Sequence, residues 1–221
     1  MKTLIISTEG QTALQPHLAN FGLYAKPIIL GNARRKGTGG WNKMGQFIAE
    51  IKLLLNNPAE RNSYVTTMFD FADIRDDFSD YQNMVNEPDK YIAVTRAESV
   101  LKASVPNERF IPYFQLPQFE TFVFTKPEVL LHEFPEGDSA IKELEHQRAD
   151  YKDGNQELIN STNKPSNRIA EALIVSPVSF KGKPIANITA DIELPFLRAS
   201  CKHFNVWLST LELLNLGNAM I

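Results

Sequence analysis

Residues 3–12 read Thr-Leu-Ile-Ile-Ser-Thr-Glu-Gly-Gln-Thr, and this stretch is the most informative feature of the chain. The apolar run at residues 4–6 is typical of a short buried strand. Gly10 allows a sharp exit from that strand, and residues 11–21 continue with an apolar pattern that suits a helix. We therefore expect Glu9 at the carboxyl end of a strand, the edge where open α/β sheets build their sites. A carboxylate there destabilises the fold unless it is solvated, paired or bound to a cation.

Strand-like and helix-like segments continue to alternate through the first half of the chain. Further strands are predicted from the segments 26–30, 64–69 and 109–115, and helices from 47–55 and 91–103. Strands that alternate with helices imply right-handed crossovers and parallel pairing. The expected fold is therefore α/β, with a mostly parallel sheet flanked by helices.

The second half of the chain has a different pattern. Residues 139–151 are charged and predict a solvated helix, whereas residues 155–167 are rich in Asn, Ser, Thr and Pro and predict a loop. An apolar stripe at helical spacing predicts a final helix and consists of Phe204, Trp207, Leu208, Leu211 and Leu214. Because no flexible linker separates the halves, we expect an α/β core over 1–125 with a helical extension over 126–221 packed on it.

Composition excludes some classes of protein. The 221 residues are 43% hydrophobic and 22% charged, which is ordinary for a globular chain that buries a full core. The formal net charge of −3 gives no global attraction to nucleic acid, so a polyanion would need a local basic patch. The single cysteine, Cys201, rules out an internal disulfide and favours a reducing compartment. With no signal sequence and no membrane-spanning run, we expect a cytoplasmic protein without membrane contact.

Three acidic residues follow predicted strands: Glu9, Asp70 and Glu120. Because the carboxyl ends of parallel strands share one edge, these carboxylates could converge and bind Mg²⁺, whose preferred ligands are oxygens. Such an ion can orient a phosphodiester and activate water. Asp73 is close enough to Asp70 to serve as an auxiliary ligand, whereas the remaining acidic run up to Asp80 predicts a solvated face. The alternative interpretation is that each carboxylate caps a helix or is simply solvated.

One basic cluster stands out, formed by Arg34, Arg35 and Lys36 ahead of a glycine-rich stretch. These cations could follow the phosphates of a nucleic acid, although a mobile surface loop explains them equally well. Cys201 and His203 are neighbours, but no second Cys/His pair completes a zinc site, so a buried structural thiol is the expectation.

Several segments, in order along the chain, match the landmarks of one family. Glu9-Gly10-Gln11-Thr12 corresponds to its Glu-Gly-x-Thr-Glu step, and residues 67–70 to its Thr-Met-Phe-Asp strand end. Residues 112–120 match part of its Pro-Tyr-x-Gln-Leu-His-Glu-Phe-Glu segment. Later landmarks are Glu157-Leu158-Ile159-Asn160, Pro165-Ser166 and Cys201-x-x-Phe204-x-x-Trp207-Leu208. On these segments the chain resembles, over nearly its whole length, the Toprim-like domain of unknown function 4276.

This resemblance implies a Toprim/Rossmann-like sheet with an acidic metal site. In Toprim domains of primases, topoisomerases and nucleases, a glutamate and aspartates bind Mg²⁺. Relatives of the family are often encoded beside an ATPase in bacterial anti-phage systems, so the resemblance also implies such a partner. Two departures weaken the enzymatic inference: Ala13 replaces a glutamate, and Pro117-Gln118 replaces His-Glu.

Two hypotheses follow. In the first, the chain is a nuclease dependent on Mg²⁺ or Mn²⁺, and Arg34, Arg35 and Lys36 hold the nucleic acid. Glu9 is then a ligand or general base, Asp70 the principal ligand, and Glu120 and Asp73 further ligands. In the second, it is a catalytically degenerate Toprim-like module that binds a protein partner such as an ATPase.

Overall fold

The computed structural model describes residues 2–7, 14–28, 43–151, 155–159, 163–175, 189 and 191–215. The chain divides into two compact units. Unit 1 comprises Met1–Gln115 and Glu212–Ile221, and unit 2 comprises Leu116–Leu211. Every strand named below lies in unit 1, whereas the elements of unit 2 are helical. This mixture of a parallel sheet, flanking helices and a helical C-terminal stretch confirms the predicted α/β class.

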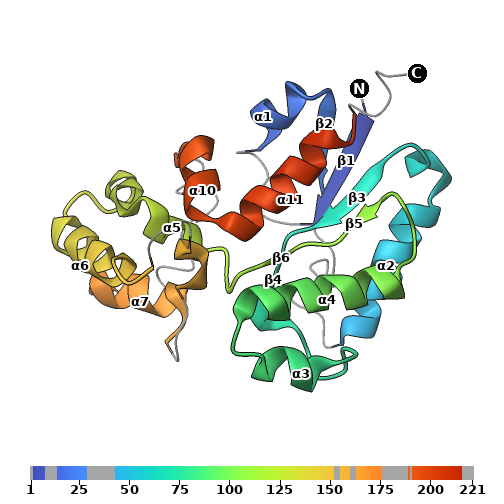
Figure 1. The fold of residues 1–221 in the computed structure, drawn as a ribbon. Coiled ribbons are helices and arrows are strands. Elements are labelled where there is room, and N and C mark those ends of the chain that lie inside the picture. Colours follow the sequence, from blue (N-terminus) through green and yellow to red (C-terminus); the bar gives the residue numbers. More distant parts are fainter. Residues whose placement is uncertain are drawn as a thin grey trace. The chain divides into compact units, whose positions relative to one another are not determined.

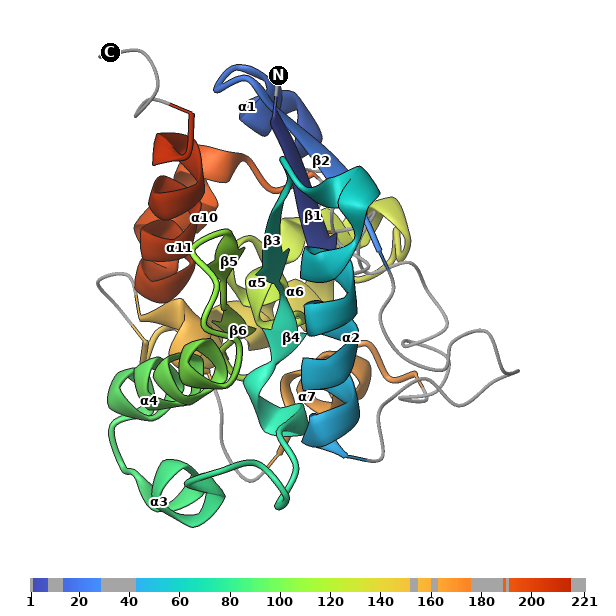
Figure 2. The ribbon, with the colours of Figure 1, turned by 90° about the vertical axis from the view of Figure 1, so that its right-hand side faces the viewer.

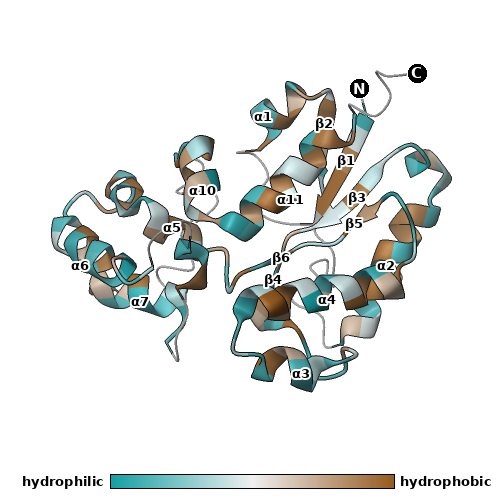
Figure 3. Cartoon of the chain, viewed as in Figure 1, coloured by the Kyte–Doolittle hydropathy of each residue, from teal (hydrophilic) through white to brown (hydrophobic). Residues whose placement is uncertain are grey.

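A four-stranded parallel sheet forms the centre of unit 1 (Figure 1). Its order is β2-β1-β3-β5, with β1 at Lys2–Ser7, β2 at Leu23–Pro27, β3 at Tyr64–Thr67 and β5 at Phe110–Ile111. The apolar residues 4–6 are fully buried, as predicted, and give β1 its hydrophobic colour in Figure 3. Burial on both faces is typical of a strand inside a parallel sheet.

Helices connect these strands on both faces of the sheet. The crossover helices are α1 (Gln15–Ala19) between β1 and β2, α2 (Met44–Asn56) between β2 and β3, and α4 (Lys90–Ser104) between β3 and β5. Figure 1 shows α1 on one side of the strands and α2 with α4 on the other. Right-handed crossovers require helices on both faces, because the chain moves from β1 to β2 in one direction and then back past β1 to β3 and β5.

A second, two-stranded ladder continues the sheet. β4 (Phe69–Asp70) pairs in parallel with β6 (Phe114–Gln115), and Figure 2 shows them prolonging β3 and β5. In both ladders, paired residues are separated by the same number of positions along the chain, so the register is the same on both sides of the break. The break falls at Pro112, which has no N–H to donate.

The hydroxyl of Thr67 spans this break. Its Oγ1 accepts the backbone N–H of Tyr113 at 2.9 Å and lies 2.8 Å from the carbonyl oxygen of Tyr113, to which it donates. Thr67 and Tyr113 are both fully buried, so these backbone groups have no access to water. The Thr67 side chain thus replaces the ladder hydrogen bonds that are missing at the break and links the first ladder to the β4–β6 ladder.

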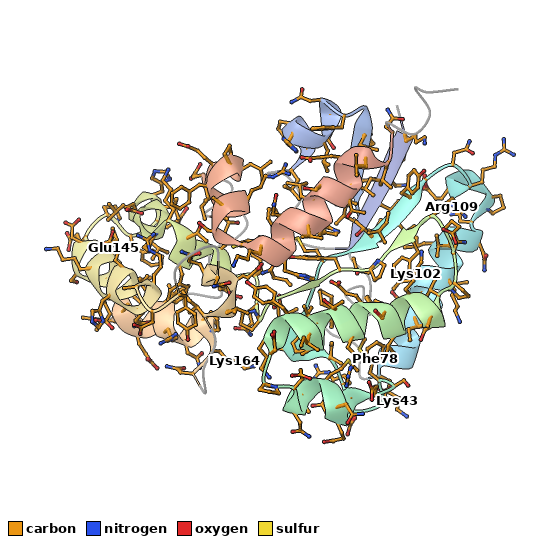
Figure 4. All side chains as sticks on the ribbon, in the orientation of Figure 1. Lys43, Phe78, Lys102, Arg109, Glu145 and Lys164 are labelled. Carbon is orange, nitrogen blue, oxygen red and sulfur yellow. The ribbon has the colours of Figure 1, made fainter. Side chains whose placement is uncertain are left out.

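The amino ends of the strands are closed by basic side chains. The Arg109 guanidinium donates to the carbonyls of Leu55 (2.6 Å), Glu60 (2.9 Å) and Ser63 (3.0 Å). Figure 4 labels Arg109 and Lys102 beside this end of the ladder. Arg109 satisfies carbonyls at the end of α2 and in the turn after it, which is a structural role.

Unit 1 also contains the short elements η3 (Pro58–Glu60), η4 (Phe71–Asp73) and α3 (Tyr81–Asn86). Unit 2 comprises α5 (Thr121–Thr125), η5 (Pro127–His132), α6 (Asp138–Arg148), η6 (Gln156–Leu158), α7 (Pro165–Ala172), α10 (Leu194–Ser200) and most of α11 (Lys202–Leu213). The predicted final helix is confirmed, since Phe204, Trp207, Leu208 and Leu211 are buried. The ring of Phe204 packs edge-on against Phe122 of α5, with centroids 5.1 Å apart.

Some boundaries differ from the prediction. The second strand begins at Leu23, not at Lys26, because Leu23 and Ala25 are the buried, alternating positions. The charged segment 139–151 is not simply solvated, since α6 buries Ala140, Ile141 and Leu144. The predicted loop 155–167 contains η6 and the start of α7 at Pro165.

We predict that Thr67→Val destabilises the protein by about 1–3 kcal/mol, because it removes both hydrogen bonds from the Thr67 side chain to the buried backbone of Tyr113. Chemical denaturation measures this free energy of unfolding. The matched control is Thr95→Val, which removes an exposed hydroxyl bonded to the Tyr91 carbonyl and should stay within about 0.5 kcal/mol of wild type. Equal stability of the two variants would contradict the bridging role of Thr67.

A second prediction concerns acid stability. A hydrogen bond from Lys26, which has the larger effect, and one from Ser63 lower the pKa of Glu60. The charged carboxylate therefore stabilises the fold. That contribution is present above the unfolded pKa of about 4.3 and is lost as the pH falls through the folded value. Lys26→Met should therefore flatten the loss of stability on acidification, whereas the exposed Lys52→Met should not. The measurement is the free energy of unfolding in a denaturation series below pH 5. The same pH dependence in wild type and in both variants would contradict the prediction.

Candidate functional site

The order in which strands are added to the sheet reverses between β1 and β3, and the carboxyl ends of these two strands lie at one edge. β1 lies between β2 and β3, with Ser7 paired to Thr67 at the ends of the two strands. The connection from β1 passes over one face through α1, and the connections leading to β3 and β5 pass over the other. In open α/β sheets, such a switch point opens a crevice beyond the carboxyl ends, and ligands bind there.

Asp70 lies on this edge in the described chain. It ends β4, which extends the line of β3 beyond Thr67, and it is half-buried. The short helix η4 follows and brings Asp73 one turn later, also half-buried. Because a 3₁₀-helix turns once in three residues, Asp73 returns towards the side of Asp70. Two of the predicted acidic residues are thus held in one short segment.

The other predicted site residues fall elsewhere. Glu9 and the basic residues Arg34, Arg35 and Lys36 lie outside the described residues. Glu120 belongs to unit 2, where it is half-buried directly before α5. Asp70 and Asp73 belong to unit 1.

Within the part of the chain that the structure describes, no group of three or more His, Cys, Asp or Glu side chains could hold a metal ion. This does not conflict with a magnesium site, because Mg²⁺ commonly takes only one or two carboxylates and keeps several waters. Asp70 and Asp73 supply oxygen ligands of the type that such an ion prefers.

Two residues of the acidic run after Asp70 have structural partners, although Asp76, Asp77 and Asp80 are all exposed, as predicted for a solvated face. The Asp77 carboxylate accepts the N–H groups of Met44 (2.9 Å) and Gly45 (3.4 Å) at the start of α2. Its negative charge suits the positive end of that helix. Asp80 lies 3.7 Å from the guanidinium of Arg96. These two carboxylates therefore have a structural role at helices.

The pair Cys201–His203 also has a structural explanation. Cys201 is a free, buried thiol directly before α11. The fully buried Glu157 carboxylate accepts the backbone N–H groups of His203 (2.5 Å) and Phe204 (3.2 Å) and so caps that helix. Burial is the main cause that raises the pKa of the Cys201 thiol well above its usual range, and the nearby charge of Glu157 raises it further. The expectation of a buried structural thiol is confirmed.

Sequence reasoning missed a polar pair at the carboxyl edge. Tyr113 and Gln115 are both fully buried, and the Tyr113 hydroxyl donates to Oε1 of Gln115 at 2.6 Å. Gln115 is the register partner of Asp70. The available signal was a glutamine inside an otherwise apolar strand, but a neutral side chain was not weighed as part of an acidic site.

The chain matches one protein family over most of its length. The model of a family described as "Domain of unknown function (DUF4276)" matches residues 7–212, so the chain belongs to that family. Searches of curated proteins and of solved structures gave no match. Among the described residues, no helix combines the length and apolar character needed to cross a membrane.

We predict that Cys201 is inert in the folded protein, because only the thiolate reacts and burial disfavours it. Iodoacetamide labelling followed by mass spectrometry should modify Cys201 only when denaturant unfolds the chain. The thiol introduced by Val206→Cys, at a position with 65% exposure, is the positive control and should react in the native state. Equal native labelling rates at the two positions would contradict the prediction.

Proposed function

We propose that the protein is a Toprim-like nuclease that depends on Mg²⁺ or Mn²⁺, with its metal at the carboxyl edge between β1 and β3. One observation carries the proposal: the parallel pairing of β1 with β3 brings the ends of both strands together at the switch point of the sheet. Asp70 continues the second of these strands. In the sequence, Glu9 follows the end of the first by two positions.

The chain's own residues would divide the work as follows. Asp70 is the principal ligand and Asp73 an auxiliary one. Glu9 is a ligand or the general base that takes a proton from the attacking water. When bound, the metal would lower the pKa of that water and neutralise charge on the phosphodiester. The half-buried setting of Asp70 supports this, because partial exclusion of water strengthens charge interactions.

Substrate binding follows from the distribution of charge. The net charge of −3 does not attract a polyanion, so the phosphate backbone must meet a local cluster. We assign this role to Arg34, Arg35 and Lys36. Arg109 is unsuitable, since its guanidinium already donates to three backbone carbonyls at the amino edge.

A second candidate function is a module without chemistry that binds a protein partner such as an ATPase. Pro117 and Gln118 favour it, because both are buried where the family carries His-Glu. Oε1 of Gln118 has no hydrogen-bond partner in the described part of the chain. A buried amide oxygen of this kind neither moves a proton nor carries a charge.

The decisive variant is Asp70→Asn, which keeps the shape of the side chain and removes its charge. We expect saturable Mn²⁺ binding by wild type in calorimetric titrations, and a loss of at least tenfold in affinity in the variant. Asp76→Asn, an exposed position in the same acidic run, is the matched control and should bind like wild type.

Cleavage assays complete the test. Wild type should cleave at least one of single-stranded DNA, duplex DNA or RNA in Mn²⁺, and a chelator should abolish cleavage. Metal binding without cleavage by the isolated chain would favour the partner-binding candidate. Wild type that binds no metal, or Asp70→Asn that binds as tightly as wild type, would overturn the proposed site.

A further inference from the structure

Unit 2 contains polar side-chain atoms that are buried and have no hydrogen-bond partner. In the described part of the chain, all such atoms belong to this unit: Gln118 Oε1, Thr121 Oγ1, Gln147 Oε1, Gln156 Oε1, Ser166 Oγ and Arg168 Nη1. All but the last are neutral oxygens. The last is a donor of a cationic guanidinium, and a buried charged group without a partner costs more free energy than a neutral one. Arg168 is therefore the residue at which a missing partner matters most.

Arg168 belongs to the first half of α7 (Pro165–Ala172). Among the residues that the structure describes, its guanidinium takes part in no hydrogen bond or ion pair. Glu171, one turn further along the helix, instead accepts the amide N–H of Asn163 at 2.9 Å. Because the Cα–Cβ bonds of a helix tilt toward its amino end, the long Arg168 side chain is directed back over the first turn. Arg168 is only half-buried as a whole, so part of the residue remains open to solvent.

The first turn of α7 offers two further donors, both on Ser166. This residue has no exposed surface, and its hydroxyl is one of the unpartnered groups. The backbone N–H groups of Asn167 and Arg168 both donate to the carbonyl of Lys164, at 2.9 and 3.0 Å. Pro165 has no N–H, and no side chain caps the helix, so the N–H of Ser166 is the donor of this turn that remains for a ligand.

The amino end of α7 is also positively charged. Lys164, the residue before the helix, is exposed, and Figure 4 labels it at the start of α7. The first turn contains no acidic residue, and the helix dipole adds positive potential at this end. Ser166 and Arg168 are only about 3 Å apart along the helix axis. A helix amino end with an arginine, a lysine and a hydroxyl has the donors that bind a phosphate group.

We propose that the amino end of α7 is a phosphate-binding site, in which the Arg168 guanidinium and the Ser166 donors bind the oxygens and Lys164 adds charge. Phosphate fits this set better than a carboxylate, because its additional oxygens can accept from the guanidinium, the hydroxyl and the N–H together. The site lies within unit 2 and does not depend on the proposed metal site. It also gives a role to Pro165-Ser166, a landmark of the sequence that the proposed nuclease chemistry does not use.

The test distinguishes a ligand site from a structural arginine. The thermal midpoint is followed as sodium phosphate replaces sodium chloride at constant ionic strength, since a ligand that binds only the folded state raises the midpoint. We expect a saturable rise for wild type, an affinity at least tenfold lower in Arg168→Met, and a smaller loss in Ser166→Ala. Because its guanidinium is unpaired, Arg168→Met without phosphate should melt at or above the wild-type midpoint.

Arg61→Met is the matched control, because it removes an exposed guanidinium from unit 1 and should bind phosphate like wild type. No saturable effect of phosphate on wild type, or unchanged affinity in Arg168→Met, would overturn the site. A lower midpoint of Arg168→Met without phosphate, or its failure to fold, would also overturn it. Arg168 would then bond a group of the protein itself, such as the unpaired amide oxygen of Gln147 or Gln156.

Two classes of compound carry this chemistry: phosphorylated small molecules and nucleic acids. The same assay with adenosine monophosphate and with a 5′-phosphorylated DNA oligonucleotide distinguishes them. A rise in the midpoint with the monophosphate alone, lost in Arg168→Met, assigns the site to a small molecule. A rise with the oligonucleotide that is lost in Arg168→Met and retained in Arg61→Met assigns it to nucleic acid.

Discussion

The parallel pairing of β1 with β3 is the constraint on which the rest of unit 1 depends. It aligns Ser7 with Thr67, so two strands far apart in the sequence end at the same height. Thr67 then extends one of them by bonding the backbone of Tyr113 across the gap at Pro112. That hydroxyl thereby supports the register of β4 with β6, in which Asp70 pairs with Gln115.

The two edges of the sheet use charge in opposite ways. At the amino edge, Arg109 and Lys102 donate to backbone carbonyls and close the ends of α2 and β5. At the carboxyl edge, Asp70 and Asp73 are half-buried, and Asp70 pairs with the fully buried Gln115 in the β4–β6 ladder. Asp70 and Asp73 thus lie at the edge where α/β sheets bind ligands, and Arg109 and Lys102 are engaged at the other.

The fold was predictable from the sequence because its signals are local. The apolar run at residues 4–6, the β-branched segment at 64–67 and the helical spacing of residues 204–211 each specify an element without reference to the rest of the chain. The break at Pro112 was not predicted, because the segment 109–115 has the composition of one continuous strand. Only the partner strand reveals that a missing N–H interrupts the ladder there.

The candidate site was predictable only in part. Asp70 was found because it ends a strand, a position that the sequence pattern specifies. The caps formed by Asp77 and Glu157 were not found, because each carboxylate accepts from a helix distant in sequence. The Tyr113–Gln115 hydrogen bond and the pairing of Gln115 with Asp70 were not predicted, because a single sequence does not show which strands pair.

Paramagnetic broadening of backbone amide signals by Mn²⁺ tests the central claim most directly, since it reports where the ion lies and falls steeply with distance. The account predicts that substoichiometric Mn²⁺ broadens the amides of residues 68–73 and of Gln115 first. The amides of Asn107 and Arg109, at the opposite edge of the sheet, should stay sharp. Strongest broadening at the amino edge, or none above that caused by free Mn²⁺, would contradict a metal site between the ends of β1 and β3.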